Sequence, residues 1–128
     1  MVVEAPLVLI VGVCASGKTT LSTGLRELGY NARSLAQEHS ASPRLWQYRQ
    51  PDFLILLDCE YSTIQQRKQI AWGLKRYGKQ QEMLQNAREH ADMIVHTDSF
   101  SPEELVSYVD EQLRARGIYP TRRLNNGS

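Results

Sequence analysis

Residues 12–19 read Gly-Val-Cys-Ala-Ser-Gly-Lys-Thr and fit the pattern G-x-x-x-x-G-K-[S/T] in full. Its glycines open backbone conformations that other residues avoid, which lets successive N–H groups face a bound anion. An aliphatic run, residues 7–11, precedes the stretch, and a helical pattern with leucines on one face, residues 18–28, follows it. The positive end of that helix adds to the attraction for phosphate. The sequence therefore predicts a phosphate-binding loop between a buried strand and a helix.

The same loop predicts a nucleotide and a metal ion as cofactors. The lysine after the second glycine can reach the outer phosphates, and the hydroxyl that follows it can coordinate Mg²⁺. We therefore expect ATP or GTP with Mg²⁺, with Lys18 as a catalytic group and Thr19 as a metal ligand. The residues expected to contact the nucleotide are Gly12, Val13, Cys14, Ala15, Ser16, Gly17, Lys18, Thr19 and Thr20.

Composition argues against several other classes of protein. The chain has 128 residues, 41% hydrophobic and 23% charged, which suits one globular domain. Its 15 Lys and Arg against 14 Asp and Glu leave a net charge of +1, so no nucleic-acid partner is predicted. The apolar runs are shorter than the ~20 residues of a membrane span, and no basic leader is visible. We expect a cytoplasmic protein without a membrane partner. Two cysteines and three scattered histidines offer neither a disulfide scaffold nor a zinc site.

Strand and helix patterns alternate along the rest of the chain. Such alternation predicts a small, mostly parallel sheet with helices on both faces, a three-layer α/β/α P-loop NTPase fold. Residues 1–118 are expected to form this domain, and the polar residues 119–128 a flexible tail. Strands are expected at residues 7–11, 31–36, 53–57 and 93–95, a short helical turn at 45–48, and further helices near Ser62, over 79–90 and after a capping box at Ser101.

Three stretches together resemble one family. They are the phosphate loop, residues 53–58 followed by Gln65-Gln66-Arg67-Lys68, and residues 91–98 followed by 101–105. In these stretches the chain resembles the P-loop kinases of small molecules and nucleoside monophosphates, such as shikimate and adenylate kinases.

The resemblance covers most of residues 7–113 and implies roles for particular residues. It implies that Arg67 lies on a lid helix that closes over the transferring phosphoryl group, and that residues 97–101 flank the purine. The family usually inserts a strand and helices that bind the phosphoryl acceptor between its second strand and its lid strand. Here only residues 37–52 fill that space, so the acceptor region is shortened and the acceptor is not named.

Two functions therefore remain open. The first is a Mg²⁺-dependent phosphotransferase that uses ATP or GTP on an unidentified small molecule. The second is a non-catalytic nucleotide-binding sensor or partner subunit, which would have a protein partner. The shortened acceptor region is the reason for the second.

Charged residues near the loop supply further candidates. Asp58 and Glu38 follow predicted strands, whose carboxyl ends face the ligand crevice of a parallel sheet. Asp58 would hold Mg²⁺ or cap the next helix, and Glu38 would act as a general base or a metal-side carboxylate, or be an exposed loop residue. His39 beside it would contact an acceptor or be exposed. Arg67 lies in a cationic run, which is either a phosphate clamp or a solvated helix face.

Two other features have a structural reading and a functional one. Residues 44–49 interleave aromatic and cationic side chains, which would stack a ring, or else Trp46 would cover the edge of the core. Cys14 and Cys59 are either free thiols or thiols whose oxidation blocks nucleotide binding.

Overall fold

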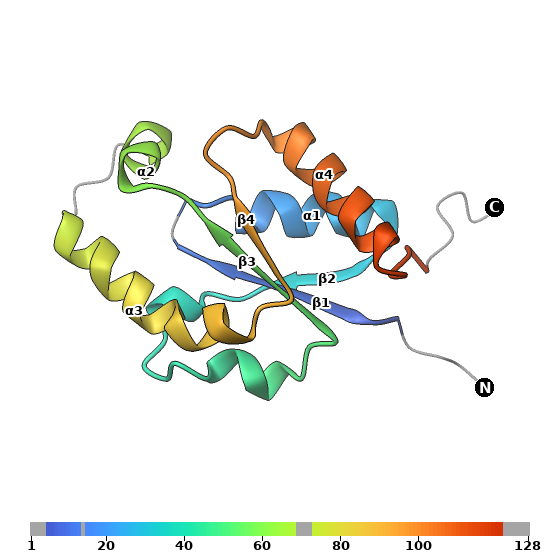
Figure 1. The fold of residues 1–128 in the computed structure, drawn as a ribbon, viewed down its shortest axis with the longest axis horizontal. Coiled ribbons are helices and arrows are strands. Elements are labelled where there is room, and N and C mark those ends of the chain that lie inside the picture. Colours follow the sequence, from blue (N-terminus) through green and yellow to red (C-terminus); the bar gives the residue numbers. More distant parts are fainter. Residues whose placement is uncertain (1–4, 14, 69–72, 122–128) are drawn as a thin grey trace.

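The sheet of this protein is all-parallel and four-stranded (Figure 1). The computed structural model describes residues 5–13, 15–68 and 73–121, and within these residues it is an α/β structure. Its strands and helices are β1 (Leu7–Gly12), α1 (Lys18–Leu28), β2 (Asn31–Ser34), β3 (Phe53–Asp58), α2 (Tyr61–Lys68), α3 (Leu74–His90), β4 (Met93–His96) and α4 (Pro102–Ala115), with two short 3₁₀ helices, η1 (Gln37–His39) and η2 (Leu45–Arg49), between β2 and β3.

The strands lie in the order β2-β1-β3-β4, so β1 is an interior strand. The chain leaves β1 toward β2 on one side and returns through β3 on the other. Because all four strands are parallel, the segments that follow each of them gather at one edge of the sheet. This edge carries the loop after β1, η1 after β2, the start of α2 after β3, and the loop after β4.

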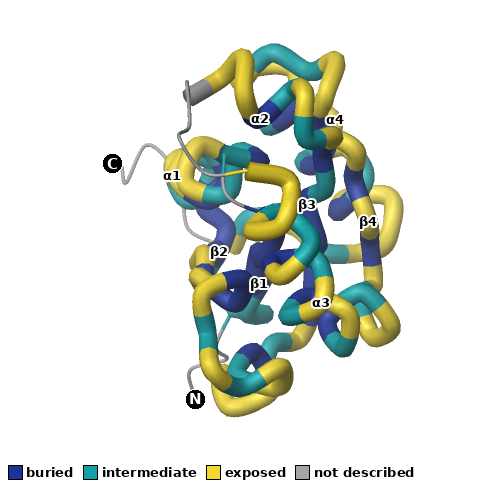
Figure 2. The backbone as a smooth tube through the Cα atoms, turned by 90° about the vertical axis from the view of Figure 1, so that its left-hand side faces the viewer, coloured by how far each residue is buried: buried dark blue, intermediate teal, exposed yellow. Residues whose placement is uncertain are grey.

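Helices pack against both faces of the sheet, with α1 and α4 on one side and α3 on the other (Figure 1). Alternate residues of β1 serve the two faces: Val8 and Ile10 pack toward α1 and α4, and Leu9 and Val11 toward α3. A strand buried on both faces needs continuous apolar sequence, which explains the aliphatic runs of β1 and β3. Figure 2 shows these two strands as the buried centre of the molecule.

The elements expected from the sequence are present, with shifts at some ends. The α/β class and the parallel sheet are confirmed. The turn expected near Leu45 is η2. At the N-terminus of α4, the Ser101 side chain accepts from the Glu104 N–H and Glu104 accepts from the Ser101 N–H, so the capping box is confirmed.

Two expected boundaries were wrong. Strand β2 ends at Ser34 rather than at residue 36, because its pairing with β1 stops there and the chain turns into η1. Helix α3 begins at Leu74 rather than at residue 79 and runs through Gly78. A glycine inside a helix costs about 1 kcal/mol but does not by itself end the helix.

None of the helices in the described part of the chain is long and apolar enough to cross a membrane. The part of the expected tail from residue 122 onward lies outside the described residues.

Candidate functional site

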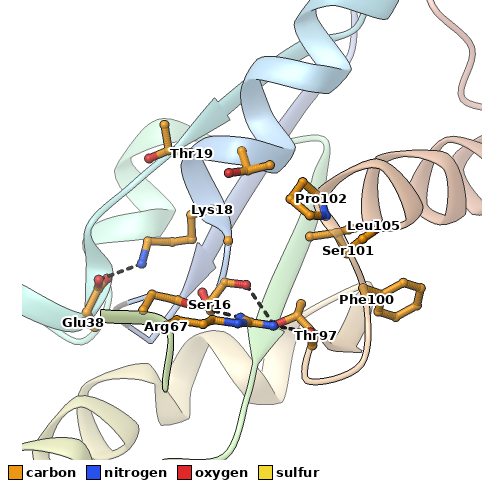
Figure 3. A pocket seen from close by; sticks show the side chains of 13 residues that line it. Ser16, Lys18, Thr19, Glu38, Arg67, Thr97, Phe100, Ser101, Pro102 and Leu105 are labelled. Carbon is orange, nitrogen blue, oxygen red and sulfur yellow. Dashed lines mark hydrogen bonds and ion pairs between the residues drawn. The ribbon is translucent and has the colours of Figure 1, made fainter. Parts of the chain in front are cut away.

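A pocket of about 560 Å³ lies at the edge of the sheet where the parallel strands end (Figure 3). The loop after β1 and the start of α1 form its floor, and three other segments complete its walls. The lining residues are Ala15, Ser16, Gly17, Lys18, Thr19, Thr20, Glu38, Arg67, Thr97, Phe100, Ser101, Pro102 and Leu105.

The backbone of the loop is tight and partly left-handed. Ala15 and Gly17 have φ angles of 64° and 107°, a region that a non-glycine residue such as Ala15 enters at a cost. At Gly12 an added Cβ would lie 2.3 Å from the Leu57 carbonyl oxygen, so this position requires glycine. Among the hydrogen bonds between described residues, the first that an N–H of α1 donates to a carbonyl is that of Leu21 to Gly17. The N–H groups that precede Leu21 are those that a helix leaves without an intrahelical acceptor at its N-terminus. Such groups are suited to binding an anion.

Lys18 is held by three acceptors. Its Nζ donates to the carbonyl oxygens of Gly12 at 2.9 Å and Val13 at 3.1 Å, and to Glu38 Oε2 at 2.7 Å. Gly12 and Val13 therefore bind the Lys18 ammonium through their carbonyl groups and are not themselves lining residues of the pocket. The six residues from Ala15 to Thr20, all expected to contact a nucleotide, line the pocket itself. Cys14 lies outside the described residues.

Glu38 reaches the pocket from η1 and is deeply buried, with 2% of its side chain exposed. Its neighbour Gln37 fixes η1, because Gln37 Nε2 donates to the Ser42 carbonyl at 2.7 Å and Gln37 Oε1 accepts from the Trp46 N–H at 2.8 Å. Glu38 Oε2 binds Lys18, whereas Glu38 Oε1 is buried and has no hydrogen-bond partner among the described residues. Of the two sequence readings of Glu38, the exposed loop residue is wrong.

Arg67 comes into the pocket from α2. One terminal nitrogen of its guanidinium donates to the Ala15 carbonyl at 3.0 Å and to Thr97 Oγ1 at 3.2 Å, and the other donates to the Thr97 carbonyl. These contacts use three of the five N–H groups of a guanidinium, which leaves donors for an anion. The structure thus brings Arg67 to the loop of residues 12–19, which is where the resemblance to the small-molecule kinases implies it.

Thr97 links two segments at the pocket that are far apart in the sequence. Its hydroxyl donates to the Ser16 carbonyl at 2.8 Å, and its N–H donates to the Asp58 carbonyl at 2.8 Å. The side chain is nearly inaccessible, at 1% exposure for the residue. Thr97 therefore connects the glycine-rich loop of residues 12–19 to the ends of β3 and β4, a role that sequence reasoning did not assign to its side chain.

One side of the pocket is apolar. Figure 3 shows Phe100, Pro102 and Leu105 on the side away from Glu38. Phe100 precedes the helix cap of α4 and Leu105 lies four residues inside the helix, the spacing of a hydrophobic staple. That spacing is the signal by which the sequence could have located this wall.

Asp58 is not brought into the pocket. Its carboxylate pairs with Arg88 of α3 at 3.2 Å and accepts from Gln81 Nε2 at 3.0 Å. Its two predicted roles, a metal ligand and a cap for α2, find no support in these contacts, because its oxygens face α3. Among the described residues no group of three or more His, Cys, Asp or Glu side chains forms a metal cage.

Other predicted residues lie away from the pocket. His39 is exposed, with Nε2 at 3.7 Å from Glu38 Oε2. The cationic run that holds Arg67 continues into α3 with Lys75, Arg76 and Lys79, which are exposed. Trp46 is 8% exposed and its Nε1 donates to Asn86, so the core-edge reading is confirmed. Its ring lies against His90, with the ring centroids 5.6 Å apart, and does not line the pocket.

Cys59 is a buried free cysteine, as one reading of the sequence expects. Burial raises the pKa of its thiol to about 11. The thiol is therefore protonated at neutral pH and a poor nucleophile.

No model of a known protein family matches the chain, and no curated protein matches it either.

Proposed function

We propose that this chain is a P-loop protein that binds ATP or GTP with Mg²⁺, on a three-layer α/β/α fold of the P-loop kinase kind. The observation that carries the proposal is the convergence of Lys18, Arg67 and the N-terminus of α1 on one pocket. The pocket lies beyond the carboxyl end of β1, where the chain connections turn to opposite sides of the sheet. Open parallel sheets bind their ligands at such switch points.

The polar half of the pocket suits the phosphates of a nucleotide. The open N–H groups at the start of α1, the ammonium of Lys18 and the remaining donors of Arg67 all favour a polyanion. The apolar half, with Phe100 and Pro102, suits the flat face of a purine, which ATP and GTP share.

A divalent cation fits the residues of the pocket. Thr19 lines it, and Glu38 presents a buried oxygen, Oε1, without a hydrogen-bond partner in the described part of the chain. Mg²⁺ prefers such oxygen ligands and in nucleotide sites takes one or two side chains besides the phosphates. Thr19 and Glu38 would hold it, and bound Mg²⁺ neutralises charge on the phosphates.

The chemistry supported best is phosphoryl transfer to a small molecule. This reaction needs positioned positive charge more than covalent chemistry. Lys18 would hold the outer phosphates, and Arg67, which α2 presents across the loop, would bind the oxygens of the group in transfer. The resemblance of residues 53–68 and 91–105 to small-molecule kinases supports the same reading.

One observation favours the alternative of a non-catalytic nucleotide-binding sensor or partner subunit. Between β2 and β3 the chain forms only the 3₁₀ helices η1 and η2. The resemblance leads one to expect a larger acceptor-binding insertion at this place, and a protein without it would bind a nucleotide and report it to a partner.

Calorimetric titration with ATP, GTP and their diphosphates in the presence of Mg²⁺ tests the nucleotide site. We expect Lys18→Ala to weaken binding about tenfold or more, because a hydrogen bond to a charged group contributes about 1.5–3 kcal/mol. The matched control is Lys79→Ala, which removes a lysine from the exposed face of α3 and should bind like the parent chain. Equal affinities of the parent chain and Lys18→Ala would contradict the proposal.

A screen of small metabolites for stimulated release of diphosphate then separates the kinase from the sensor. With an acceptor in hand, Arg67→Ala should lower kcat more than nucleotide affinity if its contacts form mainly in the transition state. Tight nucleotide binding without any stimulating acceptor would favour the sensor.

A further inference from the structure

The ammonium of Lys18 has three N–H groups, and the structure gives each of them a protein acceptor. Two acceptors are the backbone carbonyls of Gly12 and Val13, and the third and shortest contact is the carboxylate of Glu38 at 2.7 Å. A phosphate oxygen that binds Lys18 must therefore replace one of them. Glu38 is the one that belongs to a movable side chain, since the carbonyls are fixed by the backbone of β1 and its loop.

Displacement from Lys18 would leave Glu38 in an unfavourable state. Its side chain is 2% exposed, and its other oxygen has no hydrogen-bond partner in the described residues. Moving a charged carboxylate from water into a buried site costs a large free energy when no cation is paired with it there. The bound phosphates would add further negative charge close to it, which disfavours a second charged group.

The remaining described residues do not compensate this charge. His39 lies 3.7 Å from Glu38 Oε2 but is itself exposed, and Arg67 donates to Ala15 and Thr97 and forms no ion pair with Glu38 in the described part of the chain. Glu38 is also the only carboxylate among the described residues that lines the pocket, because Asp58 faces Arg88. A divalent cation bound to the phosphates is the partner that restores the balance, since carboxylate oxygens are its preferred ligands.

We propose that Glu38 makes the pocket selective for a metal-loaded nucleotide over the metal-free one, by exchanging its pairing with Lys18 for a divalent cation carried by the phosphates. This inference rests on the proposed nucleotide-binding function. It assigns to Glu38 a role in ligand choice that Lys18 and the loop backbone do not supply, because those groups attract any polyanion. Gln37, which fixes η1 through Ser42 and Trp46, is a positioning residue for this exchange.

The test is a pair of calorimetric titrations of the full chain with ATP, one in excess Mg²⁺ and one in excess EDTA, repeated with GTP. The parent chain should bind the Mg²⁺ complex at least about tenfold more tightly than the free nucleotide, because only the complex compensates the buried carboxylate. Glu38→Gln keeps the size of the side chain and an acceptor for Lys18 but removes the charge. It should bind the free nucleotide at least about tenfold more tightly than the parent chain does, and its preference for the Mg²⁺ complex should shrink.

Two further variants keep the test decisive. Asp58→Asn removes the charge of the competing carboxylate. If this variant retains the Mg²⁺ preference, the inference is supported. If Asp58→Asn loses the preference and Glu38→Gln retains it, the inference is overturned. Glu38→Asp keeps the charge and carries the test if Glu38→Gln does not fold. It should retain a preference for the Mg²⁺ complex, and its loss there would contradict the inference.

The two proposals fail in different ways. If the parent chain binds neither nucleotide under either condition, the proposed function fails and this inference with it. If it binds nucleotide but Glu38→Gln shows the Mg²⁺ preference of the parent chain, the nucleotide site stands and the role of Glu38 is overturned.

Discussion

The two faces of the sheet are built differently. On one face, α1 and α4 press aliphatic side chains such as Leu25 and Val109 against β1 and β3, and the cluster is apolar apart from Tyr30. On the other face, α3 contributes Leu84 and Ala87 over a length of 17 residues. The buried polar side chain of α1 is Ser22, on the first side, whereas Gln37, Glu38 and Gln80 lie in η1 and α3, on the second side.

This difference indicates that one face mainly stabilises the fold and the other mainly positions the side chains of the pocket. The face of α1 and α4 fixes the glycine-rich loop of residues 12–19, because α1 begins where this loop ends and packs against the sheet. The face of α3 holds the polar groups that place Glu38, and the adjoining α2 carries Arg67. Stability should therefore depend more on the first face, and the behaviour of the pocket more on the second.

The largest expected effect is on a leucine of the first face. Leu25→Ala removes a fully buried side chain between α1 and the sheet, and should lower the free energy of unfolding by about 3 kcal/mol. The matched control is Leu74→Ala at the start of α3, where the side chain is 65% exposed and the change should stay within about 0.5 kcal/mol. Urea unfolding followed by circular dichroism measures both. Similar losses in the two variants would break the comparison.

Two glycines, one on each face of the sheet, test the same comparison more closely. In α1, a Cβ on Gly24 would lie 2.5 Å from Val106 Cγ2 of α4, so Gly24→Ala should destabilise the protein by about 1–3 kcal/mol through overpacking. In α3, a Cβ on Gly78 meets nothing within 4 Å, so Gly78→Ala should stabilise the protein by about 1 kcal/mol through helix propensity. Thermal unfolding of the two variants should shift in opposite directions. A stabilising Gly24→Ala would mean that α1 and α4 are less closely packed than the structure shows.

The smallest expected effect concerns the anchor of α2. Asp98 Oδ1 accepts from the Glu60 N–H at 2.8 Å and from Thr63 Oγ1 at 2.6 Å. Burial alone would raise the pKa of Asp98, but the hydrogen bonds from Thr63 and Glu60 outweigh it and lower the pKa below its usual value. A carboxyl with a lowered folded-state pKa stabilises the fold above its unfolded pKa of about 3.9, and this stability is lost as the pH falls through the folded value.

Asp98→Asn keeps an acceptor at this position but does not titrate. It should change the free energy of unfolding at neutral pH by about 1 kcal/mol or less, and it should make stability fall less steeply in acid than in the parent chain. Urea unfolding at a series of pH values between about 3 and 7 measures the two slopes. Parallel slopes would show that Asp98 does not anchor α2 in solution.

Much of the fold follows from local sequence rules. The glycine-rich loop, the aliphatic runs of β1 and β3, and the capping box at Ser101 each depend on residues close together in the chain. Propensity did not locate the start of α3, because Gly78 weakens the helical pattern without ending the helix.

The sequence by itself determined the glycine-rich loop of residues 12–19 and the alternation of strands with helices, because both depend on residues close together in the chain. Only the tertiary structure decided which distant groups meet there: Glu38 reaches Lys18 across 20 residues, Arg67 reaches Ala15 across 52, and Thr97 reaches Ser16 across 81. The tertiary structure also decided that the Asp58 carboxylate pairs with Arg88 and does not face the pocket. The physical reason is that parallel pairing brings the ends of separate strands to one edge, whereas the direction of each side chain there depends on the helices packed against that edge.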